Sequence, residues 1–182
     1  AIIWAEKALF YDPDNELALA ETIVIPAFQM RAKKWAKEDI GDLFKLRQLT
    51  VKMDHGLKKF PDSPFFLSIG GMYFSIKYQI TQNKSDLNQA LPYLLKSHSI
   101  LKETFYQNLD FLLEGAKDIN FEMIPTIYSW LDQSDKAAEF LIMNKNMICE
   151  DSSYECLNLW RLTDYSGVFY GSYQYNEALE IL

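Results

Sequence analysis

The residue types that usually carry acid–base or metal chemistry are scarce in this chain. Among its 182 residues, only His55 and His98 are histidines. His55 falls near the end of a basic helix, where the helix C-terminus favours a cation, and His98 lies beside an apolar helical face, so a structural role accounts for both. Asp132 and Asp135 fall at a turn, where carboxylates cap helices. The chain lacks HExxH, CxxC, GxSxG and phosphate-binding glycine loops, so we expect no enzyme activity, metal or cofactor.

Cys149 and Cys156 are the two cysteines, with six residues between them. Neither has a histidine nearby, so they do not suggest a metal site or a catalytic dyad. Two interpretations stay open. They are reduced, partly buried thiols, or they form a disulfide between two helices, which would imply an oxidising compartment. The compartment also stays open, with a cytoplasmic location slightly favoured over an extracytoplasmic one.

Hydrophobic residues recur at helical spacing through most of the chain, and the alternating pattern of strands is absent. Because 49% of the residues are hydrophobic and 15% aromatic, the chain is too apolar for a disordered tail. We therefore predict an all-α fold. Pro26 is expected to kink or break the second helix, and a turn is expected at 118–120. The predicted helical segments are 1–11, 16–37, 43–60, the hairpin 63–101, 103–117, 121–131, 134–148, 152–170 and 173–182.

The hairpin Ser63–Leu101 is the best-defined of these segments, with two helices joined by the polar turn 83–86. In its first helix, Gly70 and Gly71 share a face with Phe74. Each glycine inside a helix costs about 1 kcal/mol relative to alanine. We therefore expect a neighbouring helix to approach this face closely. The alternative is that the two glycines end a short helix.

The hairpin resembles the tetratricopeptide repeat in the order Leu67-x2-Gly70-Gly71-x2-Phe74, then Ala90-x3-Leu94-x2-Ser97. AEKALFYDPDN, GLKKFPDSP and FYGSYQYNEALEIL are similar to helix ends and turns of that family. This copy has roughly seven extra residues between its two motifs and lacks the closing proline. The resemblance implies an α-α superhelix of antiparallel helix hairpins, with irregular or extended repeats, in one domain over 1–182. Both ends would cut through a repeat, as in a fragment of a longer chain, and the repeat-like units would be about 1–15, 16–62, 63–102, 103–150 and 151–182.

In that family, the first helix of each repeat lines a concave groove that binds a peptide or a partner helix. The resemblance places in this groove Phe65, Ser68, Met72, Ser75 and Ile76, and in the last copy Trp160, Thr163, Gly167 and Tyr170. Some members hold a peptide carboxylate with a Lys and an Asn. Ser68 and Met72 stand in those places here, so chaperone C-terminal tails are not expected as ligands. An apolar groove favours an amphipathic helix or an extended apolar peptide. The alternative is that these residues only pack between hairpins.

Charge is distributed unevenly along the chain. From Arg31 to Lys59, nine Lys or Arg stand against four acids, whereas from Glu103 onward four stand against fourteen. The acidic half argues against nucleic acid as the main partner. Lys45, Lys52 and Lys59 recur every seven residues, which indicates either a basic ridge for an acidic partner or a solvated helix surface. No run of about twenty apolar residues is present, so no membrane span is expected.

Three functions are compatible with these features. The first is a non-catalytic protein–protein interaction scaffold that presents a concave repeat surface to a peptide or partner helix of unknown identity. The second is a regulatory or sensor segment of a larger enzyme or transcription regulator, which rests on fold-level analogy alone. The third is an extracytoplasmic helical protein that binds a small apolar ligand, and a disulfide between Cys149 and Cys156 would favour it. The oligomeric state is not indicated.

Overall fold

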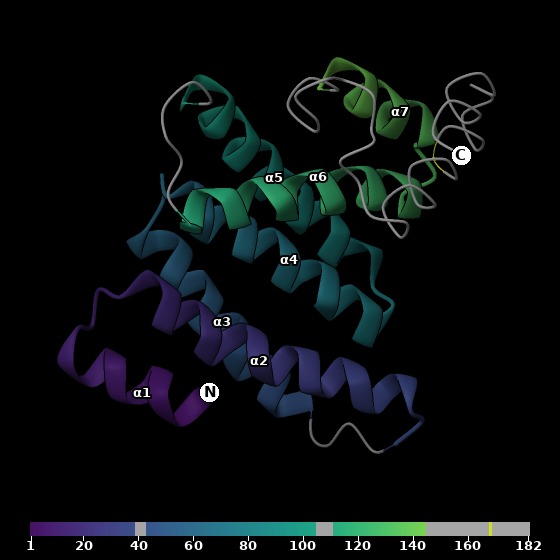
Figure 1. The fold of residues 1–182 in the computed structure, drawn as a ribbon. Helices are drawn as coiled ribbons and strands as arrows, with labels where there is room; N and C mark the ends of the chain where they lie inside the picture. Colours follow the sequence, from purple (N-terminus) through teal and green to yellow (C-terminus); the bar gives the residue numbers. More distant parts are fainter. Residues whose placement is uncertain (39–42, 105–110, 145–167, 169–182) are drawn as a thin grey trace. The chain divides into compact units, whose positions relative to one another are not determined.

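A computed structural model describes residues 1–38, 43–104, 111–144 and 168 (Figure 1). These residues form seven α-helices and no strand, so the all-α prediction is confirmed for them. The helices are α1 (Ile2–Tyr11), α2 (Glu16–Trp35), α3 (Leu43–Lys59), α4 (Pro64–Thr81), α5 (Lys84–Thr104), α6 (Phe111–Trp130) and α7 (Ser134–Met143).

The chain divides into two compact units, Ala1–Ile119 and Asn120–Leu182. In the first unit, α4 is the central helix and packs against α2, α3 and α5. Helix α2 also packs against α1 and α3, so neighbouring helices in the chain are neighbours in space (Figure 1). In the second unit, the buried residues Phe121 and Phe140 bring their rings to a centroid distance of 5.9 Å.

Polar residues before α2 and α4 define where these helices begin. The Asn15 side chain accepts a hydrogen bond from the Ala18 N–H (2.9 Å), and Ser63 Oγ accepts one from the Phe66 N–H (3.1 Å). Each side chain thereby satisfies a backbone donor that has no partner inside its helix. Ser63 Oγ also donates to the Glu16 carboxylate (2.6 Å), so the two helix starts are joined.

Neither of two predicted interruptions breaks its helix. Helix α2 continues through Pro26, which is buried together with Ile23 and Ala27, so packing on both sides of the proline keeps the helix intact. The predicted turn at 118–120 is wrong, because α6 runs through it. Its buried face contains Ala116, Asn120, Ile124 and Ile127, spaced four, four and three residues apart. Asn120 belongs to that buried stripe, and composition alone misread it as a turn residue.

Helix α4 approaches its neighbours closely at two glycines, as predicted. A methyl group added at Gly70 would lie 2.9 Å from Leu57 Cδ2 of α3, and one at Gly71 would lie 2.6 Å from Leu94 Cδ2 of α5. Contacts under 3 Å are not tolerated between carbon atoms, so neither position has room for a side chain unless its neighbour moves. The alternative that these glycines end a helix is excluded, because α4 continues to Thr81.

A buried hydrogen-bonded cluster joins α3 to α4. Tyr73 OH donates to the Leu46 carbonyl (3.1 Å) and lies 2.8 Å from Thr50 Oγ1, which also reaches the Leu46 carbonyl (3.0 Å). Burial, chiefly, raises the pKa of Tyr73 from 10.0 to about 12, with the charges of Asp86 and Asp54 adding to the rise and the Thr50 hydrogen bond opposing it.

The stability that Tyr73 contributes is expected to disappear at alkaline pH. Unfolded chains lose the phenolic proton near pH 10, before folded ones do, so this contribution is complete below pH 10 and is lost as the pH rises through 12. Between pH 9 and pH 11, urea unfolding should show the wild type losing about 1 kcal/mol more than Tyr73→Phe. The exposed substitution Tyr11→Phe is the matched control and should follow the wild type. Parallel losses in wild type and Tyr73→Phe would contradict this expectation.

Candidate interaction surface

The groove residues expected from the family resemblance lie mostly in the interior. Phe65, Ser68, Ser75 and Ile76 are buried, and Met72 is half-exposed. A buried side chain offers no surface to a partner. For these four residues, the alternative interpretation, packing between hairpins, accounts for the structure.

Ser68 illustrates this packing role. Its Oγ lies 2.8 Å from Ser97 Oγ of α5, 3.0 Å from the Pro64 carbonyl and 3.2 Å from the Ala116 carbonyl of α6. Ser97 Oγ also donates to the Pro64 carbonyl (2.7 Å). Small hydroxyl side chains therefore let α4, α5 and α6 meet while satisfying each other's polar atoms.

Of the remaining predicted residues, some lie inside the described ranges and others lie outside them. Lys45 and Lys52 are exposed on α3. Lys59 is half-buried, forms an ion pair with Asp14 (2.5 Å) and donates to the Pro13 carbonyl. It therefore joins the turn between α1 and α2 to the end of α3. Trp160, Thr163, Gly167, Tyr170, Cys149 and Cys156 lie outside the residues that the structure describes.

The exposed face of α3 combines apolar side chains with cations. Leu43, Phe44 and Val51 are 49%, 58% and 69% exposed. At helical spacing, Phe44 and Val51 lie along the middle of this face. Cations lie on both sides of them, and the exposed ones are Lys45 and Lys52 on one side and Arg47 and Lys58 on the other. We call this set of seven residues the α3 face.

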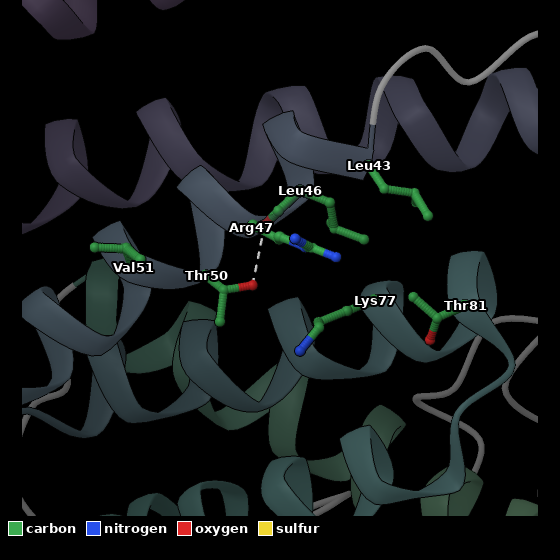
Figure 2. A pocket seen from close by; sticks show the side chains of 7 residues that line it. All are labelled: Leu43, Leu46, Arg47, Thr50, Val51, Lys77 and Thr81. Atoms are coloured by element: carbon green, nitrogen blue, oxygen red, sulfur yellow. Dashed lines mark hydrogen bonds between the residues drawn. The ribbon is translucent and has the colours of Figure 1, made fainter.

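A cavity of about 410 Å³ lies beside the α3 face, between α3 and α4. Figure 2 shows its lining side chains, five of which come from α3 and two, Lys77 and Thr81, from α4. Most of the described lining is apolar or hydroxyl-bearing, and two cations complete it. The lining residues are Leu43, Leu46, Arg47, Thr50, Val51, Lys77 and Thr81.

The two cations of this cavity differ in their surroundings. Lys77 Nζ pairs with the buried Asp86 carboxylate at 2.9 Å, and Thr81 Oγ1 donates to the same carboxylate (2.8 Å). Arg47 is exposed and makes no hydrogen bond or ion pair with other residues in the described ranges. Its guanidinium is therefore the cation available to an anion at the cavity mouth.

A second cavity, of about 430 Å³, lies on the other side of Val51 and is lined by α1, α2 and α3. Its described lining residues are Glu6, Leu9, Leu19, Thr22, Val51, Lys52 and His55. Val51 thus forms part of the wall of both cavities. The α3 face is therefore a ridge with a hollow on each flank.

The described residues hold no group of three or more His, Cys, Asp or Glu that could bind a metal ion. His55 lines the second cavity, and His98 is buried. Tyr73, with its raised pKa, stays protonated at neutral pH and cannot act as a base there. Within the same ranges, no helix combines the length and apolarity needed to cross a membrane.

Comparison with family models, with curated proteins and with solved structures gave no match for this chain.

The sequence indicated only part of the α3 face. The seven-residue spacing of Lys45 and Lys52 was visible, but Arg47, Leu43 and Val51 were not recognised as surface residues. The signal was present, because Phe44 and Val51 lie off the buried stripe of Leu46, Leu49, Met53 and Leu57. Both residues therefore fall on the same exposed side of α3 as Lys45 and Lys52.

Proposed function

We propose that this protein is a non-catalytic interaction scaffold that binds a protein segment along the α3 face. One observation carries the proposal: an exposed apolar strip, bordered by cations, stands beside an open cavity with mostly apolar walls. Exposed apolar residues grouped in this way are typical of binding surfaces. Helix α3, which carries this face, is well packed on its other side, where Leu46, Leu49, Met53 and Leu57 are buried.

The tetratricopeptide-like superhelix belongs to the same proposal. Two features support it. The first is the antiparallel α4–α5 hairpin, with its close approach at Gly71. The second is the packing of α2 against α4, the next helix but one along the chain. In a superhelix of this kind, stacked hairpins bury one another and leave long faces available to partners. Four of the five residues first expected in a groove on α4 are buried, so the proposal places the partner on α3.

Val51→Asp tests the proposal, because it places a charge in the middle of the α3 face at an exposed position. Wild type, Val51→Asp and the control Gln89→Asp, which makes the same charge change at an exposed position of α5, would each capture partners from native lysate. Proteins captured by wild type and control would be purified, and their dissociation constants measured. We expect Val51→Asp to weaken binding by about tenfold or more, with unchanged circular dichroism. Equal affinity in all three proteins would refute the proposal.

A further inference from the structure

Resting on the proposed function, we infer that the occupant of the α3 face is an acidic amphipathic helix. One of its aliphatic side chains enters the cavity between α3 and α4, and a nearby carboxylate pairs with Arg47. Three properties of the surface lead to this occupant: its charge, the chemistry of the cavity wall and the spacing of its residues.

Charge selects an acidic partner. Lys45, Arg47, Lys52 and Lys58 surround the apolar strip, and Asp54 is the exposed acid on α3. Glu6 faces the second cavity rather than the first, and the positive charge of Lys77 is offset by Asp86. The surface is therefore positive, so it attracts carboxylates and disfavours a basic partner through like-charge repulsion.

The cavity selects an aliphatic side chain with a carboxylate close to it. Leu43, Leu46 and Val51 supply apolar wall, and Arg47 is exposed at its edge (Figure 2). A cavity of about 150 Å³ already accommodates benzene, so about 410 Å³ receives a leucine or phenylalanine side chain. Burial of that side chain supplies affinity, and the guanidinium fixes the orientation through a charge-assisted hydrogen bond.

The spacing along α3 selects a helix over an extended peptide. Phe44 and Val51 are seven residues apart, as are Lys45 and Lys52, so each pair is separated by about 10 Å along the axis. A helix lying along α3 repeats its own face every seven residues and meets both pairs with equivalent side chains. In an extended peptide, positions about 10 Å apart are three residues apart, and their side chains point to opposite sides.

Two synthetic peptides of about 20 residues test the inference, a length at which isolated helices can form. Both carry the same leucine face, and the flanking positions are glutamates in one and lysines in the other. Fluorescence anisotropy would measure their affinities for wild type, Arg47→Glu and the control Lys102→Glu, which reverses an exposed charge on α5. We expect the glutamate peptide to bind wild type about tenfold more tightly than the lysine peptide, and Arg47→Glu to remove that preference. The control should change neither affinity appreciably.

Equal binding of the two peptides by wild type would overturn the inference, as would an unchanged preference in Arg47→Glu or no binding of either peptide. These outcomes are separable from failure of the proposed function. If Val51→Asp still abolishes capture of a cellular partner, the α3 face is a binding surface and only the chemistry of its occupant is wrong. If Val51→Asp retains that partner as well, the scaffold proposal fails with it.

Discussion

Replacing Gly71 with valine is expected to lower the free energy of unfolding by about 2 to 3 kcal/mol. Already the first carbon of the new side chain would lie 2.6 Å from Leu94 Cδ2 and 3.0 Å from Leu94 Cδ1. Leu94 is fully buried, so it has no solvent-facing rotamer to which it can retreat. Helices α4 and α5 must therefore separate, and the contacts between them weaken. Urea unfolding followed by circular dichroism would measure the loss.

Gly115 provides the matched control, because a methyl group added there meets nothing within 4 Å. It lies inside α6, so Gly115→Ala should raise the free energy of unfolding by about 0.5 to 1 kcal/mol through helix propensity. A double-mutant cycle identifies the clash itself. Gly71→Ala should be less harmful in the Leu94→Ala background, since the colliding atoms are gone. Additive effects of these two substitutions would show that contact with Leu94 is not the cause of the destabilisation at Gly71.

Replacing Lys77 with methionine is expected to cost about 3 kcal/mol, because the Asp86 carboxylate would be left buried without its cation. Asp86 is 2% exposed and lies 2.9 Å from Lys77 Nζ. The hydroxyl of Thr81 still donates to it but carries no charge. Thermal and urea unfolding of Lys77→Met would measure the loss, and adding Asp86→Asn should recover part of it.

The surface pair Lys96–Asp62 is the control for this prediction. Its distance is 2.8 Å, similar to that of the buried pair, but the Asp62 side chain is 81% exposed. Water therefore solvates both charges after the pair is broken, and Lys96→Met should cost less than about 1 kcal/mol. Equal losses in Lys77→Met and Lys96→Met would show that burial does not govern the strength of these pairs.

Most of the helices were predictable because they have local causes. The apolar stripe of α3 repeats at helical spacing, and Asn15 and Ser63 mark the starts of α2 and α4. The close approach at Gly70 and Gly71 was also predictable, since glycine inside a helix needs a compensating contact. The sequence signal for each of these features lies in residues near each other in the chain.

The errors arose where distant residues decide the outcome. Pro26 and Asn120 favour interruption by composition, yet burial keeps both inside helices. Ser68 and Ser75, placed in a groove by analogy, are buried, and Ser68 lies within hydrogen-bond distance of Ser97 of α5. The cavity beside Arg47 forms only when α3 lies on α4, so no local pattern could reveal it.

Val51 has one further consequence, since it lines the cavities on both flanks of α3. An occupant that holds Val51 in one rotamer on one flank also sets the shape of the hollow on the other. Occupancy of the two hollows is then thermodynamically linked, and the factor by which the first ligand changes the affinity of the second equals the reverse factor. In the proposed scaffold, two such ligands would each report on the other with no movement of the helices.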